Sequence, residues 1–459
     1  MATYWVEPPP AGNDGNPGTF LSPWASPQHA LDTCIAGDIC NFKDGTYDVG
    51  TGVDADTNSG SIGNVITFQA VNSRLAIWEL TANGRILEVN GVDYITFDGI
   101  DFKGDVTFAQ STHIYLINCE NITFDDCEPR DCLGRAIAMW GGVKHLDILN
   151  CEIHMETTDG EYDGIYSWGA GNEDLYVYNT EVYHIAHTGI GMKACDGILI
   201  EECYIHDTYG HCISLTSSGG AGPKNIVIRN NQISGAENWG PGSGSPHNGI
   251  RITEDAENVE CYRNDIWNCD ARGIEIWSNA IGPIYCYNNT LYDNNQGLYS
   301  EGSFQFYNTG NDADPEVNFR NNIIYHTQAA GASQFVMYVS SNVSDNLTMD
   351  YNLWYSTGVV EMRRNGTTYA NFALYAAAYE ANSVFSDDPD FTNAGAADFT
   401  LLVTSPAIDA GVDVGLPYQG TAPDIGAHEY ETIPPSVTVH AASALAVDSP
   451  CTRIAGRRQ

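Results

Sequence analysis

One short pattern recurs along most of the sequence. It consists of an apolar residue, any residue, a second apolar residue, two further residues, and then Cys, Asn or Thr. Nine clear copies end at Cys127, Cys151, Thr180, Cys203, Asn231, Asn264, Asn289, Asn322 and Asn352, and two weaker copies end at Val71 and Ile100. Successive copies lie 23 to 33 residues apart, a length typical of one three-sided solenoid coil. The repeat therefore predicts an all-β fold, a right-handed parallel β-helix of about eleven coils.

The last residue of each copy is expected to point inward, in one column along the solenoid axis. Equivalent residues of neighbouring coils lie about 4.8 Å apart, so Asn side chains in this column can hydrogen-bond to one another. Cys and Thr would fill the same column as small buried side chains. We expect these cysteines to be structural and unpaired, because a disulfide requires a specific dihedral geometry.

A second strand pattern occurs once in each of seven coils. It is seen in RAIAMW, DGIYSW, TGIGMK, HCISLT, NGIRIT, RGIEIW and QGLYSE, which begin at residues 135, 163, 188, 211, 248, 272 and 296. Successive side chains of a strand point to opposite faces, so the central Ile or Leu is expected to point inward. The flanking residues would then point outward into solvent, where they form the candidate site.

The two ends of the chain have different patterns. SPQHALDTCIAG has a Ser-Pro start and helical spacing, which predicts a helix that covers the first coil, and Cys34 and Cys40 are the expected disulfide beside it. NFALYAAAYEAN predicts a second short helix. The predicted segments are a leader with a capping helix at 1–63, the β-helix at 64–370, a helix and loop cap at 371–430, and a disordered tail at 431–459.

The charge of the chain restricts its partners. Nineteen basic and 59 acidic residues give a formal net charge of −40, which disfavours binding to nucleic acid and to anionic membranes. No apolar stretch approaches the length of a membrane span, and no signal region follows Met1, so any export signal is expected to have been removed. An anionic polysaccharide would be repelled unless cations or a local basic patch offset the charge. The excess acid indicates either calcium binding or solubility in salty surroundings.

Both end segments resemble those of a known group of proteins. YWVEPPPAGNDGNPGTFLSPWASPQHALDTCIAGDICNFKDGTY is similar to the leader of secreted right-handed β-helix repeat proteins, and SDDPDFTNAGAADFTLLVTSPAIDAG with PDIGAHEY resembles their terminal segment. This resemblance implies an extracellular β-helix of the kind found in pectate lyases, alginate lyases and epimerases. Because the group also contains hydrolases and proteins without known activity, function must be argued from the site.

Three outward columns are predicted on the second strand. The first holds Trp140, Trp168, Lys193, Thr216, Thr253, Trp277 and Glu301. The second holds Ala138, Tyr166, Gly191, Ser214, Arg251, Glu275 and Tyr299, and the third holds Arg135, Asp163, Thr188, His211, Asn248, Arg272 and Gln296. Aromatic rings beside charges suit a sugar chain, because pyranose faces stack on rings and hydroxyls need polar partners. We predict substrate binding by Trp140, Tyr166, Trp168, Arg272, Glu275, Trp277 and Tyr299. The alternative is that the rings only fill cross-strand ladders.

The basic residues of these columns suggest lyase chemistry. β-Elimination on a uronate needs a group that neutralises the carboxylate, a base, and a donor to the leaving oxygen. Arg251, Lys193 and His211 are the predicted catalytic residues, with Arg251 or Lys193 as the base. HNGIRI resembles the strand that carries the base in calcium-dependent pectate lyases, which implies that role for Arg251. The alternative is a surface ion pair between Arg251 and Glu275.

An acidic turn precedes one of these strands. TTDGEYDG resembles the calcium-binding turn of the same lyases, which implies that Asp159, Glu161 and Asp163 are metal ligands and that calcium is the cofactor. The alternative is a turn that is only solvated. The full set of paired aspartates of those lyases is absent.

The leading hypothesis is a secreted lyase that acts on an anionic polysaccharide. The rival hypothesis is a surface protein, such as a spike or adhesin, that binds carbohydrate without catalysis. A C5 epimerase or a glycoside hydrolase is a further alternative. A hydrolase needs two facing carboxylates, for which Glu275 and Glu301 are the candidates.

Overall fold

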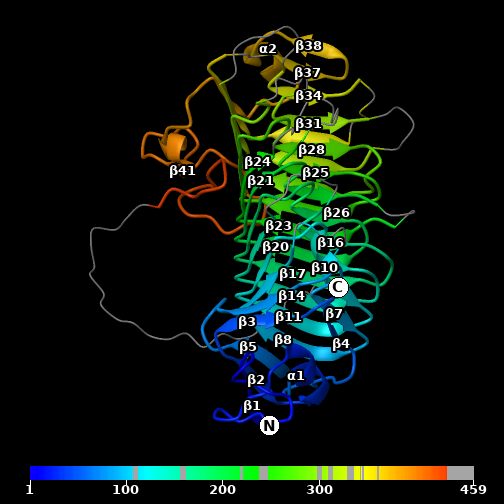
Figure 1. Cartoon of the computed structure of the whole chain (residues 1–459). Coiled ribbons are helices and arrows are strands. Elements are labelled where there is room, and N and C mark those ends of the chain that lie inside the picture. The colour runs from blue at the N-terminus through cyan, green and yellow to red at the C-terminus, as the bar shows by residue number, and fades with distance from the viewer. Residues whose placement is uncertain are drawn as a thin grey trace.

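The chain forms a long solenoid of three parallel sheets (Figure 1). The computed structural model describes residues 1–431 except 106, 108–111, 156–161, 218–220, 237–246, 297–301, 309–313, 328–334, 342, 344–345 and 359–360. Each sheet has thirteen strands, and the chain visits sheets 1, 2 and 3 in turn within each coil. No helix in these residues is long and apolar enough to cross a bilayer. The prediction of an all-β parallel β-helix is confirmed.

The strands are short and follow one another with a constant order. Sheet 1 consists of β1 (Thr3–Val6), β2 (Ile39–Phe42), β5 (Ile66–Ala70), β8 (Asp93–Asp98), β11 (Glu120–Asp125), β14 (Lys144–Leu149), β17 (Glu173–Tyr178), β20 (Asp196–Glu201), β23 (Lys224–Arg229), β26 (Glu257–Tyr262), β29 (Ile284–Tyr287), β32 (Val317–Arg320) and β35 (Leu347–Asp350). Sheet 2 consists of β3 (Gly45–Asp48), β6 (Ala76–Glu79), β9 (Ile100–Lys103), β12 (Glu128–Arg130), β15 (Glu152–His154), β18 (Glu181–Tyr183), β21 (Tyr204–Thr208), β24 (Gln232–Ala236), β27 (Asp265–Trp267), β30 (Thr290–Tyr292), β33 (Ile323–His326), β36 (Leu353–Ser356) and β39 (Val384–Phe385). Sheet 3 consists of β4 (Val53–Ala55), β7 (Leu87–Asn90), β10 (Thr112–Ile117), β13 (Arg135–Met139), β16 (Ile165–Ser167), β19 (Ile190–Met192), β22 (Ile213–Leu215), β25 (Ile250–Ile252), β28 (Ile274–Trp277), β31 (Phe304–Tyr307), β34 (Met337–Val339), β37 (Met362–Arg364) and β38 (Thr367–Tyr369).

The eleven copies of the repeat are the strands β5 to β35 of sheet 1, and β1 and β2 extend this sheet at the N-terminal end. The predicted inward column is confirmed. The Asn264 Nδ2 donates to the Asn289 Oδ1 at 3.0 Å, and the Asn289 Nδ2 donates to the Asn322 Oδ1 at 3.0 Å. The same bond links Asn231 to Asn264 at 2.9 Å and Asn322 to Asn352 at 3.2 Å. Every buried amide of this asparagine ladder therefore bonds to the next coil.

The turn from sheet 1 to sheet 2 explains why polar residues occur in pairs in the repeat. The residue before each ladder position has a positive φ, for example 55° at Asn230 and 51° at Asn288. Asn adopts this left-handed conformation more readily than other non-glycine residues. In the Asn-Asn copies the first Asn makes the bend, and the second enters the ladder.

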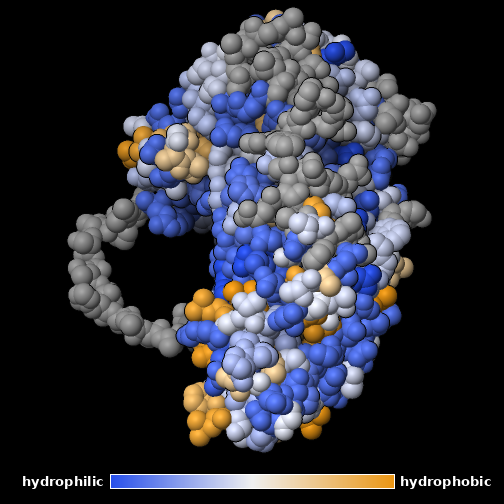
Figure 2. All heavy atoms as spheres, viewed as in Figure 1, coloured by the Kyte–Doolittle hydropathy of each residue, from blue (hydrophilic) through white to orange (hydrophobic). Residues whose placement is uncertain are grey.

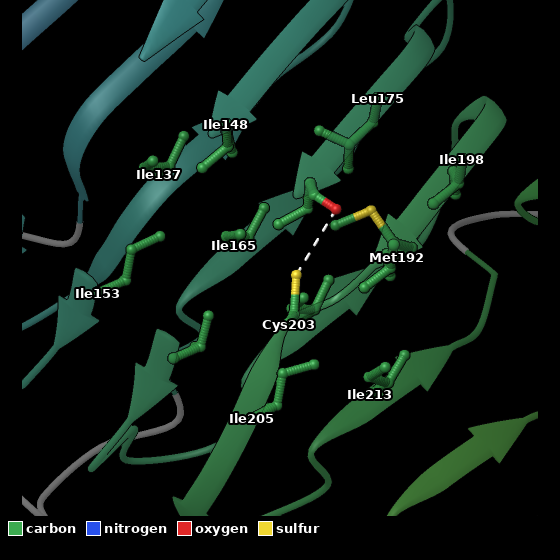
Figure 3. Close-up of a cluster of buried hydrophobic side chains, with 14 of the residues drawn as sticks. Ile137, Ile148, Ile153, Ile165, Leu175, Met192, Ile198, Cys203, Ile205 and Ile213 are labelled. Carbon is green, nitrogen blue, oxygen red and sulfur yellow. Dashed lines mark hydrogen bonds between the residues drawn. The ribbon is translucent and has the colours of Figure 1, made fainter. Parts of the chain in front are cut away.

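Inward aliphatic side chains from all three sheets fill the interior (Figure 3). Ile148 comes from sheet 1, Ile153 from sheet 2 and Ile165 from sheet 3, and all three are fully buried. All twelve cysteines of the described residues are buried free thiols. This confirms unpaired cysteines in the ladder column, whereas the expected Cys34–Cys40 disulfide is wrong. Both thiols are part of the apolar core at the first coil.

Both predicted end helices are present. The helix α1 (Pro27–Thr33) has Ser26 as its N-cap and lies at the N-terminal end, and α2 (Phe372–Ala376) has Asn371 as its N-cap and lies at the other end (Figure 1). Apolar surface is exposed near the N-terminal end of an otherwise mostly hydrophilic face (Figure 2). The leader predicted at 1–63 contains β1 to β4, and the segment boundaries stay predictions.

The chain after α2 returns along the side of the solenoid, where Figure 1 shows it beside sheet 2. It contains the hairpin of β40 (Phe391–Asn393) and β41 (Asp398–Leu401), joined by the 3-10 turn η1 (Ala394–Ala396). The Asn288 Nδ2 donates to the Asp424 carbonyl at 2.8 Å, and the Asn321 Nδ2 donates to the Val412 carbonyl at 2.8 Å. We call residues 384–431 the C-terminal strap.

The seventh strand predicted on sheet 3 was assigned to the wrong residues. QGLYSE was expected to follow β28, but β31 occupies that place, with Phe304 paired to Ile274. Gln296 is described outside any strand, and 297–301 lie outside the described residues. Both segments combine polar residues with an apolar and an aromatic residue, so their pattern does not distinguish them.

The asparagine ladder should contribute measurably to stability. Asn264→Ala should lower the free energy of unfolding by roughly 2–3 kcal/mol, because buried amides of Asn231 and Asn289 lose their partner. The exposed variant Asn90→Ala should cost less than about 0.5 kcal/mol. Equilibrium unfolding in urea compares the two. Equal losses would show that the ladder does not stabilise the fold.

Candidate functional site

The outer face of sheet 3 carries the predicted site residues in the expected columns. Tyr166, Gly191, Ser214, Arg251 and Glu275 are successive partners in the ladder. The partner of Glu275 on the next coil is Gln305. Tyr299, Asp159, Glu161 and Glu301 lie outside the described residues.

Two arginines converge on one carboxylate. The Arg251 Nε lies 3.3 Å from the Glu275 Oε2, and the Arg272 NH1 lies 3.5 Å from the Glu275 Oε1. The Asn248 Nδ2 donates to the Glu275 Oε2 at 2.9 Å. Together with His211, these residues form what we call the arginine cluster. Among the described residues, these two guanidinium groups face one carboxylate, in a chain of net charge −40.

The cluster is less exposed than alternation along the strand predicted. Arg272 is 4 % exposed, Glu275 3 % and His211 8 %, so the expectation that these side chains point into solvent is wrong. They shield each other because each reaches sideways to a partner on its own or the neighbouring coil. Arg251 is the most accessible member, with a quarter of its side chain exposed. Buried charges are costly unless paired, and such groups often mark functional sites.

His211 is held as a neutral imidazole. Burial lowers its pKa well below the ordinary value, and the neighbouring charge of Arg251 lowers it further. The backbone N–H of Asn248 donates to the His211 Nδ1 at 3.2 Å. In the neutral ring the proton therefore resides on Nε2, which makes this nitrogen a hydrogen-bond donor.

The aromatic column beside the cluster contains two pairs of rings in contact, one pair at each end. The rings of Trp140 and Trp168 meet edge to face at 4.7 Å, and the rings of Trp277 and Tyr307 lie 5.6 Å apart. Trp168 is 39 % exposed. The Arg251 guanidinium lies over the Trp277 ring at 5.3 Å, which joins this column to the arginine cluster.

Lys193 occupies the same column between the two aromatic groups. Its Nζ lies 5.7 Å from the Tyr166 ring centroid. The other four lysines of the chain, Lys43, Lys103, Lys144 and Lys224, each form an ion pair with a glutamate. Among the residues that the structure describes, no carboxylate pairs with Lys193, although the chain contains 59 acidic residues. The structure thus brings His211, Arg251 and Arg272 together and places Lys193 two coils away.

The environment of Asp163 does not fit a calcium ligand. Its Oδ1 accepts hydrogen bonds from the His187 Nδ1 at 2.8 Å and the Thr188 backbone N–H at 3.2 Å, and the Arg135 Nε lies 3.8 Å from its Oδ2. A guanidinium at this position would repel a divalent cation. We therefore derive no step that uses calcium.

One other acidic group has metal-like spacing. Glu128, Glu152 and His154 on sheet 2 have ligand atoms within 4.8 Å of one another. Arg74 forms an ion pair with Glu152 at 2.5 Å, and Arg130 lies 3.5 Å from Glu128. These arginines already neutralise the carboxylates, so the group serves as a surface ion-pair network.

Three residues of the site were not identified from the sequence. Asn248 was placed in an outward column without a role, although it links Glu275 to His211. Gln305 and Tyr307 were missed because β31 was assigned to other residues. The signal for Asn248 was its position at the strand entry, one coil before Arg272.

Comparison with known proteins identifies the type of fold. A family model described as a right-handed beta helix region matches residues 85–245. The crystal structure of pectate lyase Pel9A is 17 % identical, covers 94 % of this chain and 97 % of its own, and has a TM-score of 0.58. No curated protein sequence matches this one.

Two further solved structures are similar at lower scores. A rhamnogalacturonan lyase is 16 % identical over 77 % of this chain and 87 % of its own, with a TM-score of 0.48. The A-module of the Azotobacter vinelandii mannuronan C-5 epimerase AlgE6 is 12 % identical over 77 % and 91 %, with a TM-score of 0.49. The likeness to pectate lyase Pel9A, at 17 % identity, shows the fold alone, in agreement with the family model. The expected resemblance to β-helix proteins of the polysaccharide lyase type is confirmed at that level.

The neutral state of His211 should make stability depend on pH. The unfolded chain binds a proton at this histidine near its ordinary pKa of about 6.5, and the folded chain does not. The free energy of unfolding should therefore fall as the pH drops below about 6.5, by up to about 1.4 kcal/mol per pH unit from this residue. His211→Gln should lack this contribution, so its difference from wild type should change between pH 7.5 and 5. A constant difference would contradict a neutral His211.

Proposed function

We propose that the protein is an extracellular polysaccharide lyase that cleaves a uronate-containing, anionic polysaccharide by β-elimination on the outer face of sheet 3. The observation that carries this proposal is the local excess of positive charge. Arg251 and Arg272 share one carboxylate, and Lys193 has no ion-pair partner among the described residues, in a chain of net charge −40. Such a patch attracts an anionic ligand to this face.

Arg251 and Arg272 are suited to neutralise the uronate carboxylate. A guanidinium presents several donors in a planar fork that matches a carboxylate. Neutralisation makes the proton on the adjacent carbon more acidic, because negative charge then develops next to a balanced group. Arg251 itself is a poor base, since a guanidinium stays protonated in proteins. We therefore assign the base to Lys193 rather than to Arg251.

Lys193 has the properties that the base requires. It is half-buried, and the Tyr166 ring covers part of its surroundings. Because no described carboxylate pairs with it, its amine is not held in an ion pair and can approach the substrate. In the proposed step, the neutral amine takes the C5 proton. The electron pair of that bond forms the C4–C5 double bond, and the C4–O4 bond breaks.

His211 is suited to stabilise the leaving oxygen. Its Nε2–H can donate a hydrogen bond to O4, because Nδ1 is occupied by the Asn248 backbone. The oxygen then takes its proton from water. The aromatic column extends the site in both directions, so Trp140, Trp168 and Trp277 can stack on sugars beside the reacting one.

The geometry favours a lyase over a hydrolase. Among the described residues the ladder neighbours of Glu275 are Arg251 and Gln305, neither of which is a carboxylate, and Glu301 lies outside them. A C5 epimerase would use the same proton abstraction and return the proton to the sugar. A binding protein without catalysis would use only the arginines and the aromatic column.

Removal of the proposed base should abolish elimination. Lys193→Ala should lower kcat by about 10²- to 10⁴-fold on a cleaved uronate polymer, as the ultraviolet absorbance of new unsaturated ends reports. Lys144→Ala is the matched control, because Lys144 lies on sheet 1 and pairs with Glu173, and it should keep full activity. Activity in Lys193→Ala would refute the assignment. If wild type cleaves no uronate polymer but binds one, the protein is a carbohydrate-binding protein instead.

The two tryptophan positions should differ in their kinetic effects. Trp168→Ala should raise KM about tenfold with little change in kcat, because this ring lies away from the arginine cluster. Trp277→Ala should also lower kcat, because its ring supports the Arg251 guanidinium. Steady-state kinetics of both variants on one polymer give the comparison. Identical profiles would argue against the cation–π contact as a positioning element.

A further inference from the structure

The C-terminal strap and the turns of the solenoid together line an open cavity. The cavity has a volume of about 900 Å³, within the range of small-ligand sites. Its lining includes Asn230, Arg263, Leu401, Tyr418, Gln419 and Tyr430. It lies at the turns from sheet 1 to sheet 2, the edge of each coil that is opposite sheet 3. This cavity is therefore separate from the arginine cluster.

The walls of the cavity are held in place by several contacts. The His428 Nε2 lies 2.7 Å from the Asp265 Oδ2, and the Ala427 N–H donates to the Thr290 Oγ1 at 3.1 Å. The Phe399 ring packs against the Trp267 and Tyr292 rings, with centroids 5.7 and 5.0 Å apart. The strap is thus anchored on both sides of the cavity, which preorganises it for a ligand.

Two tyrosines in the cavity differ from the tyrosines of sheet 2. The rings of Tyr292, Tyr325 and Tyr355 stack on one another at 4.7 to 4.9 Å, so their faces are occupied. Within the described part of the chain, no aromatic ring contacts Tyr418 or Tyr430, and Tyr418 is 42 % exposed. Tyr430 packs against the apolar cluster that contains Leu401 and Ile425, so Tyr418 is the ring whose face can stack on a ligand.

The polar groups of the cavity also retain hydrogen-bonding capacity. In the same row of turn residues, Asn288 and Asn321 use their amides to bind the strap. The Asn230 amide makes no hydrogen bond to a described residue, and neither does the Gln419 side-chain amide. Amides that offer both donors and acceptors are suited to sugar hydroxyls.

The cavity carries no excess of positive charge, unlike the arginine cluster. Its lining holds Arg263 with two carboxylates, Glu429 and Glu431, and His428 is paired with Asp265. A site without excess positive charge does not select for an anion. An aromatic face, free amides and this charge distribution together fit a polyhydroxylated ligand without a carboxylate.

We propose that this cavity binds a neutral pyranose or a short neutral oligosaccharide. Tyr418 provides the stacking surface, Tyr430 lines the same cavity, and Asn230 and Gln419 bind the hydroxyls. The inference goes beyond the proposed lyase function and does not depend on it, because the cavity and the arginine cluster share no residue. A protein with both sites would hold a neutral part of a glycan on one side and an acidic part on the other.

Binding to neutral sugars tests this proposal without any activity assay. The full chain is titrated by calorimetry with cello-, xylo-, manno- and galactotetraose, each up to about 10 mM. We expect saturable binding of at least one of them. Tyr418→Ala should weaken it about tenfold, as expected for loss of a stacking platform. Asn230→Gly should weaken it too, and glycine tolerates the positive φ of this position.

Tyr355→Ala is the matched control, because Tyr355 is an outward tyrosine of sheet 2 that does not line the cavity. It should bind the neutral sugar like wild type, and thermal unfolding should show that all variants are folded. The proposal is overturned if none of the four sugars binds, or if Tyr418→Ala and Tyr355→Ala bind the neutral sugar equally well. It is also overturned if Tyr418→Ala weakens the binding of acidic oligosaccharides alone. None of these outcomes bears on elimination at Lys193.

Discussion

The register between coils is the constraint on which the whole structure depends. Each strand pairs in parallel with the equivalent strand of the next coil, so any side chain meets its counterpart at about 4.8 Å. This spacing allows asparagine amides to form a continuous ladder through Asn231, Asn264, Asn289, Asn322 and Asn352. Because these amides bond to one another between coils, a slip of one residue in the strand pairing would leave buried polar groups unpaired. The ladder therefore fixes the strand register, and with it the outward positions, in the coils from Asn231 to Asn352.

The same register brings the residues of the arginine cluster together, and with them the free-energy cost of burying charged groups. Arg251 and Glu275 are direct ladder partners, and Arg272 reaches the same carboxylate from the strand entry. Burying the charges of Arg272 and Glu275 beside the partly exposed Arg251 is costly for a fold that could place hydroxyls there. A positive site for an anionic polymer gives a reason for this cost, because a protein of net charge −40 otherwise repels such a polymer.

The C-terminal strap has a structural role in addition to the cavity it lines. Sheet 2 carries a stack of outward rings, and the strap covers part of it through Phe391 and Phe399. An uncovered aromatic surface of this kind favours association between molecules. The strap therefore shields sheet 2, while sheet 3 keeps its outer face for polar and aromatic groups.

The repeat by itself determined the solenoid, the inward column and the outward columns, because strand alternation and coil length follow from local pattern. Arg251, Glu275, Trp168 and Lys193 were placed correctly for this reason. Only the tertiary structure decided how these side chains reach across columns, which buries Arg272 and Glu275 and keeps His211 neutral. The same holds for the free thiols at Cys34 and Cys40 and for the strap, since contacts such as His428 with Asp265 join residues 163 positions apart. Local pattern carries no information about such contacts, because they depend on how distant segments pack.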